Sequence, residues 1–75
     1  MKLPVVSGKK LVKALSRLGY EQDHITGSHI ILRLDRAPFT RVTVPNHPEI
    51  SKGTLLSIMR HVGMTRDNLI KLLKE

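Results

Sequence analysis

The clearest candidate for chemistry in this sequence is a histidine, His29, at the start of an alternating segment over residues 29–34. One side of that segment carries the aliphatic residues Ile30, Leu32 and Leu34, and the other carries His29, Ile31 and Arg33. A period of two is typical of a half-buried strand, so we expect the aliphatic side to face the core and His29 to share the outer face with Arg33. An imidazole beside a guanidinium can bind a phosphodiester and transfer a proton near neutral pH.

The other three histidines lie in positions that favour different roles. His24 stands beside Asp23 near a turn, where we expect a solvent-exposed side chain. His61, near the end of a predicted helix, suits a favourable interaction with the helix dipole, and we expect neither His24 nor His61 to be needed for catalysis. His47 lies in a loop between two prolines and is either a general acid or a structural loop residue. For His29, the residues alone leave two alternatives: it is catalytic, or it has no function, as is usual for an exposed histidine on a strand.

The sequence contains no common motif that would give these histidines a metal ion or a covalent partner. His24 and His29 are five residues apart across a turn, without an acidic residue at a recognisable ligand spacing. There is no H-E-x-x-H pattern, no nucleophile elbow around a serine and no glycine-rich phosphate loop. The chain has no cysteine, which excludes disulfides and thiolate zinc sites and fits a reducing cytoplasm. We therefore expect acid–base chemistry without a metal or other cofactor, in a cytoplasmic protein.

Charge is the strongest compositional signal. Thirteen Lys and Arg against six Asp and Glu give a formal net charge of +7 on 75 residues, and the isoelectric point is about 10.4. A polyanion is the natural partner of such a chain, and nucleic acid is the commonest polyanion. The only aromatic residues are Tyr20 and Phe39, so the chain lacks the stacking platforms of most single-strand RNA binders. The alternative is a protein that is cationic without having a nucleic-acid partner.

The length of the chain predicts one small domain, residues 1–75, with a modest core and no deep cleft between lobes. Hydrophobic residues make up 40% and charged residues 25%, which is ordinary for a folded protein and argues against disorder. No apolar run approaches the roughly 20 residues of a membrane span. The stretch before the first proline is too short for a signal peptide. We therefore expect no association with a membrane.

Amphipathic patterns predict three helices. Leucines at helical spacing mark the first, over residues 8–18, with Ser7 as its N-cap and Gly19 at its end. Its outer face is basic and consists of Lys9, Lys10, Lys13 and Arg17. The second helix begins at Ser51 or Lys52 and ends at Gly63, and the third covers residues 66–75 after its N-cap Thr65.

Between the first two helices, alternation predicts strands over residues 20–26, 29–34 and 40–44, whose short connections make an antiparallel meander. The predicted class is α+β, in the order α-β-β-β-α-α, with helices packed on one face of a three-stranded antiparallel sheet. The other face then collects side chains from two adjacent strands: His29, Ile31, Arg33, Arg41 and Thr43. The sequence thus predicts a histidine and two arginines together on an open surface.

A series of short motifs, in a specific order and spacing, extends over residues 7–73. They are Ser7-Gly8-Lys9, Leu18-Gly19-Tyr20, Gly27-Ser28-His29, Val42-Thr43-Val44-Pro45, His47, and Ile50-Ser51-Lys52-Gly53-Thr54-Leu55 leading into Ile58. With these motifs the chain resembles the HicA-type mRNA interferase toxins of bacterial and archaeal toxin–antitoxin systems.

This resemblance implies a fold similar to the double-stranded-RNA-binding domain and an endoribonuclease that cleaves mRNA without a metal, which inhibits translation and growth. The catalytic histidine of the family's Gly-Ser-His motif falls on His29. The partners implied are mRNA and a HicB-like antitoxin that covers the active face. Many relatives have a basic residue just before this motif, where this chain has Thr26. A phosphate contact missing there would weaken RNA binding, move it to other cations, or mark a protein that binds RNA but cuts it poorly.

In the mechanism that we expect, His29 removes the proton of a ribose 2′-OH, which attacks the adjacent phosphorus. Arg33, Arg41 and Lys52 stabilise the charge that develops on the phosphate. The expected RNA-binding residues are Lys9, Lys10, Gly27, Ser28, Arg33, Arg41, His47 and Lys52. Two other classes of function remain. One is a non-catalytic basic RNA-binding module of the same fold, and the other is an interaction protein whose basic face docks an acidic partner.

Overall fold

The computed structural model describes residues 3–74, which contain three helices and three strands in the order that the sequence predicts. They are α1 (Gly8–Ser16), β1 (Tyr20–Thr26), β2 (His29–Leu34), β3 (Arg41–Pro45), α2 (Lys52–Val62) and α3 (Arg66–Leu73). The predicted α+β class and the α-β-β-β-α-α order are confirmed. Among the residues described, no helix combines the length and the hydropathy of a membrane span.

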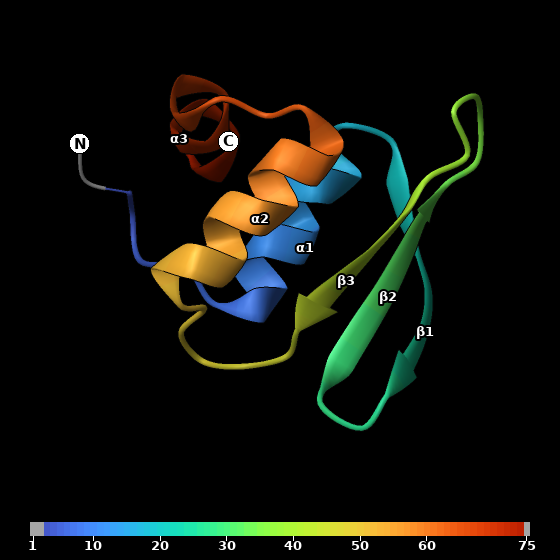
Figure 1. Ribbon diagram of the computed structural model, residues 1–75, viewed down its shortest axis with the longest axis horizontal. Helices are drawn as coiled ribbons and strands as arrows, with labels where there is room; N and C mark the ends of the chain where they lie inside the picture. The colour runs from blue at the N-terminus through green and yellow to red at the C-terminus, as the bar shows by residue number, and fades with distance from the viewer. Residues whose placement is uncertain (1–2, 75) are drawn as a thin grey trace.

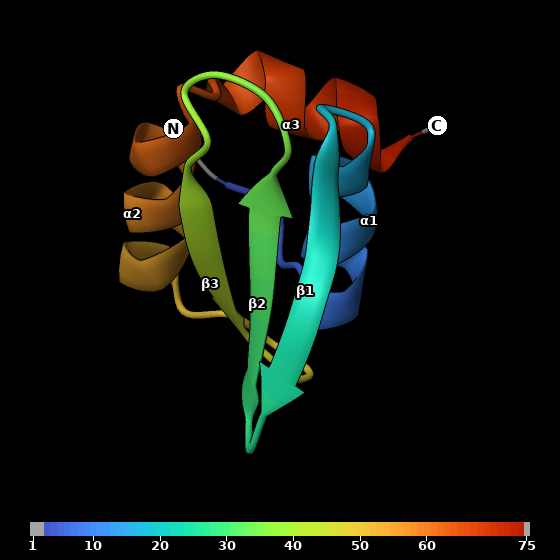
Figure 2. The same cartoon turned by 90° about the vertical axis from the view of Figure 1, so that its right-hand side faces the viewer.

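The strands form one antiparallel sheet in the order β1-β2-β3, with β2 in the centre. Figure 2 shows the sheet face on, with the three helices behind it and the near face uncovered. The hairpin of β1 and β2 extends beyond the helices (Figures 1 and 2), and Tyr20 is the one buried residue of β1. The described helices therefore leave most of β1 and the tip of the hairpin uncovered.

The core lies between the covered face of the sheet and the helices. Ile30, Leu32 and Leu34 are buried there, whereas His29 and Arg33 on the opposite face are exposed and Ile31 is half-buried. The predicted alternation of β2 is therefore confirmed. Burial of an aliphatic side chain contributes roughly 1.5–3 kcal/mol, and a shift of one residue would expose all three of these side chains. The core thus holds the ring of His29 on the open face.

Short polar caps begin the helices where the sequence predicts them. The Ser7 hydroxyl accepts a hydrogen bond from the backbone N–H of Lys10 at 3.1 Å, and α2 has Ser51 as its N-cap. Thr65 caps α3 in a reciprocal arrangement with Asn68. Gly63, with a φ of 73°, ends α2 in the left-handed conformation that glycine adopts readily.

The first helix is shorter than the predicted residues 8–18. It ends at Ser16 because the chain tightens there: the N–H groups of Arg17, Leu18 and Gly19 bond to the carbonyl three residues back instead of four. Gly19 has a φ of 102° and completes the turn into β1.

The last strand and the last helix also differ slightly from the prediction. The strand covers Arg41–Pro45 instead of residues 40–44, since Phe39 before it is left-handed, with a φ of 56°. At its other end, the Asn46 N–H donates to the Ser28 carbonyl at 2.6 Å and keeps Pro45 paired with β2. The helix α3 ends at Leu73, and residue 75, included in the predicted helix, lies outside the described residues.

Candidate active site

His29 is the first residue of β2 and lies on the open face of the sheet. It pairs with Thr26 on β1 and with Pro45 on β3, and its side chain is exposed. The two residues before it, Gly27 and Ser28, form the hairpin turn, in which Gly27 has a left-handed φ of 54°. The hydrogen bond from Asn46 to the Ser28 carbonyl fixes the other side of the turn. Backbone pairing on both sides therefore holds the position from which His29 projects.

The two predicted arginines of the open face lie directly opposite one another. Arg33 on β2 pairs with Arg41 on β3, and both side chains are exposed. A carboxylate that the sequence pattern does not assign to the site joins them. Asp23 Oδ2 lies 2.9 Å from Arg41 Nη1, and Asp23 Oδ1 lies 4.0 Å from Arg33 Nε. Because both guanidinium groups face this carboxylate, they form one cluster on the open face.

An irregularity in β1 places Asp23 there. Gln22 pairs with Leu32 and His24 pairs with the next residue, Ile31, so Asp23 is an extra residue without a partner on β2. Such a β-bulge interrupts the alternation of side chains and re-aims them, often next to active sites. Consequently both Asp23 and His24 reach the open face.

The faces on which the two ends of β1 must lie indicate that the strand contains a bulge. Tyr20 has to face the core, whereas Thr26 lies opposite His29 on the open face. These two positions are six residues apart, and strict alternation would give them the same face. One extra residue between them resolves the conflict, although the conflict alone does not identify which residue bulges.

Asp23 and His24 form a hydrogen-bonded pair at the bulge. The Nδ1 atom of His24 lies 3.2 Å from Asp23 Oδ2, and the His24 side chain is 52% exposed, as the sequence predicts. Desolvation alone would raise the pKa of the Asp23 carboxyl, but the hydrogen bond with His24 and the charges of Arg41 and Arg33 outweigh it and hold that pKa below its usual value. Asp23 is therefore an anion throughout the neutral range.

Two other predicted site residues, Lys9 and His47, meet at the start of α1. The His47 carbonyl accepts a hydrogen bond from the Gly8 N–H at 2.9 Å. A shallow hollow beside this bond is lined by Ser7, Lys9, Asn46, His47 and Pro48. Gly8 is needed there, because a Cβ atom at this position would overlap the Pro45 carbonyl oxygen. This hollow adjoins the residues that hold the Gly27-Ser28 turn, but none of its lining residues belongs to the open face.

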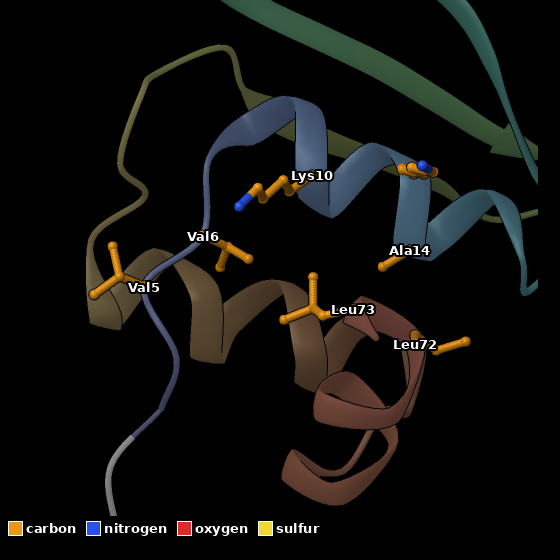
Figure 3. Close-up of a pocket in the computed structure, with 7 residues that line it drawn as sticks. Val5, Val6, Lys10, Ala14, Leu72 and Leu73 are labelled. Carbon is orange, nitrogen blue, oxygen red and sulfur yellow. The ribbon is translucent and has the colours of Figure 1, made fainter. Parts of the chain in front are cut away.

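Lys10 and Lys52 are not brought to the open face. Lys10 borders a hollow between α1, the N-terminal segment and α3, shown in Figure 3, together with Lys13 and aliphatic residues. Lys52 borders a different depression, which Leu56 and Met59 of α2 also line. The eight residues predicted to bind RNA thus divide into an open-face group beside His29, a group at the start of α1, and two separate lysines.

His61 has a structural partner. Its Nε2 atom lies 2.7 Å from the carbonyl oxygen of Arg41, at the outer edge of β3. The sequence predicts that His61 lies where it interacts favourably with the helix dipole, and His61 does lie in the last turn of α2. The contact with Arg41 adds a second role, because it ties this helix to the edge of the sheet.

Within residues 3–74, no three histidine, aspartate or glutamate side chains are grouped so that they could hold a metal ion. The open face instead combines an exposed imidazole, a second imidazole bonded to a carboxylate, and two guanidinium groups. This is a set of groups for binding an anion and transferring protons.

Comparison with known proteins identifies the family of this chain. The model of the family described as HicA toxin of bacterial toxin–antitoxin matches residues 8–64, which is more than half of the chain and includes the Gly27-Ser28-His29 turn. No curated protein and no solved structure matches the chain. With its fold and this match over most of its length, the chain belongs to the HicA toxin family of bacterial toxin–antitoxin systems.

Proposed function

We propose that this protein is a metal-independent endoribonuclease that binds and cleaves mRNA in the cytoplasm, with His29 as the catalytic residue. The observation that carries the proposal is the position of His29: an exposed imidazole, held by backbone pairing on both sides, on the same face as two paired arginines. Membership of a toxin family supports it, because degradation of mRNA stops translation and growth.

The proposed reaction uses the 2′-OH of the RNA as its nucleophile. His29 takes the proton from this hydroxyl, and the oxygen attacks the neighbouring phosphorus to form a 2′,3′-cyclic phosphate. General-base catalysis of this kind is worth roughly 10² to 10⁴-fold in rate. Arg33 and Arg41 stabilise the negative charge that grows on the phosphate oxygens. DNA is not a substrate, since it lacks the attacking hydroxyl.

RNA binding in this proposal extends from the open face around the end of the sheet. The Gly27-Ser28 turn brings backbone groups near the scissile phosphate, and Arg33 and Arg41 bind it. Lys9 and His47, which meet at the start of α1, bind a neighbouring phosphate. Lys10 and Lys52 attract more distant phosphates through their charge, which acts over a Debye length of roughly 8–10 Å at physiological salt.

The proposed protein partner is a HicB-like antitoxin that covers the open face. A toxin of a toxin–antitoxin pair has a neutralising partner. Covering His29 and the two arginines would block both proton transfer and phosphate binding. Acidic side chains on the antitoxin would suit a surface that carries these cations.

The test is incubation with RNA and with an all-deoxy strand of the same sequence, in EDTA. Cleavage of the RNA alone, lost in the variant His29→Ala, supports the proposal. Binding without cleavage would instead identify a non-catalytic RNA-binding module, and absence of RNA binding would indicate a protein whose basic surface docks only an acidic partner. RNA cleavage that requires added divalent metal would contradict the proposed mechanism.

A further inference from the structure

We infer that His24 is the general acid of the proposed cleavage, donating a proton to the departing 5′-oxygen, and that Asp23 positions its ring. This inference rests on the proposed function and adds a second catalytic histidine to it. It also revises the expectation from the sequence that His24 is dispensable.

Strand pairing places His24 and His29 on the same face. His29 pairs with Thr26 on β1, and His24 pairs with Ile31, two residues beyond His29 on β2. Residues that pair directly share a face, as do residues two apart on a strand. His24 and His29 are therefore diagonal neighbours on the open face, and such neighbours have Cβ atoms about 7–8 Å apart or somewhat less.

This separation suits an acid and a base that act on one phosphodiester. In an in-line displacement the attacking 2′-oxygen and the leaving 5′-oxygen lie on opposite sides of the phosphorus. Each catalytic ring needs to come within about 2.6–3.2 Å of its own oxygen. We infer that imidazoles at this separation reach opposite sides of one phosphate, and Arg33 lies further along the same face of β2.

The hydrogen bond with Asp23 determines which ring nitrogen of His24 delivers the proton. A carboxylate only accepts hydrogen bonds, so Nδ1, at 3.2 Å from Asp23 Oδ2, carries a hydrogen. Nε2 is then the nitrogen available to the substrate. A carboxylate that holds one nitrogen of an imidazole fixes the orientation of the ring, which is the usual arrangement behind a catalytic histidine.

The two histidines complete one balanced transfer. His29 starts neutral and receives the proton of the 2′-OH as the bond from O2′ to phosphorus forms. His24 starts protonated and gives its Nε2 proton to O5′ as the bond from phosphorus to O5′ breaks. The products are a 2′,3′-cyclic phosphate and a 5′-hydroxyl. Exchange with water then returns His29 to its neutral form and His24 to its protonated form.

The other histidines are less suited to this step. His47 lines the hollow at the start of α1, and no residue of the open face lines that hollow. His61 is bonded to the Arg41 carbonyl at the edge of the sheet. Within residues 3–74, the other charged groups that strand pairing and ion pairs place on this face are the carboxylates of Glu21 and Asp23 and the guanidinium groups of Arg33 and Arg41. Arginine does not lose its proton in proteins, and the lowered pKa of Asp23 keeps its carboxyl ionised.

The experiment compares two versions of one RNA, after the site at which the parent protein cuts has been mapped. In the second version, sulfur replaces the bridging 5′-oxygen at that site. A thiolate leaves without being protonated, so the modified RNA needs no general acid. Rates are measured for the parent protein, for His24→Ala, His29→Ala and Asp23→Asn, and for His61→Gln as the control. Thermal melting checks that each variant is folded.

We expect His24→Ala to cut the ordinary RNA roughly 10² to 10⁴-fold more slowly than the parent and to recover most of that loss on the sulfur-containing RNA. Asp23→Asn should show a smaller loss with the same recovery, which a purely structural role would not produce. His29→Ala should lose about 10² to 10⁴-fold in rate on both substrates, without recovery on the sulfur-containing RNA, and His61→Gln should match the parent.

Two results would overturn the assignment of His24 without touching the proposed function. One is cleavage of ordinary RNA by folded His24→Ala at the parent rate. The other is an equal loss on both substrates, which would mean that His24 does not protonate the leaving group. Failure of the parent protein to cut either RNA would overturn the proposed function, and this inference with it.

Discussion

Replacing two residues on opposite faces of β2 should separate catalysis from folding. His29 is exposed, whereas Leu32 is 1% exposed in the core. Truncating a surface side chain usually changes stability by no more than about 0.5 kcal/mol, but Leu→Ala in a core costs about 2–5 kcal/mol. One kcal/mol shifts the melting temperature of a domain of this size by about 4–8 °C. Leu32→Ala should therefore lower the melting temperature by at least about 8 °C, and His29→Ala by no more than about 4 °C.

The activities should change in the opposite sense. His29→Ala should reduce the rate of RNA cleavage by about 10² to 10⁴-fold, because it removes the proposed base. Leu32→Ala should keep its activity per folded molecule at temperatures below its transition. The assay combines melting by circular dichroism with cleavage of a labelled RNA in EDTA, corrected for the folded fraction. A His29→Ala protein that melts like the parent and cuts at the parent rate would refute the role of His29, and one that fails to fold would refute its placement on the open face.

Three further predictions concern individual residues. Gly8→Ala should destabilise the fold by about 1–3 kcal/mol, because the added Cβ would overlap the Pro45 carbonyl oxygen. Gly53→Ala, with open space around it, should be neutral or stabilising by up to about 1 kcal/mol. Chemical denaturation of both variants measures the difference, and equal stabilities would contradict it. The fold lowers the pKa of the Asp23 carboxyl, so the ionised carboxylate stabilises the folded protein relative to the variant Asp23→Asn. This stability difference should be complete well above the unfolded-state pKa of about 3.9 and should disappear as the pH falls through the folded-state pKa. Melting curves of both proteins at a series of pH values measure the difference, and a difference that grows in acid would have the wrong sign. RNA affinity should fall steeply as the salt concentration rises. Arg41→Gln should reduce the slope of log affinity against log salt by about 0.7 for each single-strand phosphate that the variant no longer neutralises, and Glu49→Gln serves as the control. An unchanged slope in Arg41→Gln would show that Arg41 does not belong to the binding surface.

Much of the fold could be predicted because each element has a pattern that is local in the sequence. The alternation of residues 29–34 required burial of Ile30 and Leu32, and the structure has both in the core. The caps at Ser7 and Thr65 depend on side-chain bonds within one helical turn, so their motifs suffice. These features need no information about the rest of the chain.

The features that were missed depend on contacts between distant residues. Asp23 becomes part of the site only because β1 bulges and because Arg41, 18 residues further along, reaches it. His24 and His29 become neighbours through strand register, which the pattern of neither strand determines alone. Charge alone groups Lys10 and Lys52 with the site, yet the rotation of α1 and α2 against the sheet places them at separate hollows. That rotation depends on packing between elements.

The bulge at Asp23 has a consequence for how copies of this protein meet one another. β1 is an edge strand, and an edge with regular free N–H and C=O groups can pair with the edge of another molecule and begin aggregation. A bulge in mid-strand breaks the repeat of those groups, so a second sheet cannot match its register along the full length of β1. At the opposite edge, the bond from His61 occupies the Arg41 carbonyl. The residue that turns His24 toward the open face thus also helps to keep a toxin with an exposed hairpin from associating with itself.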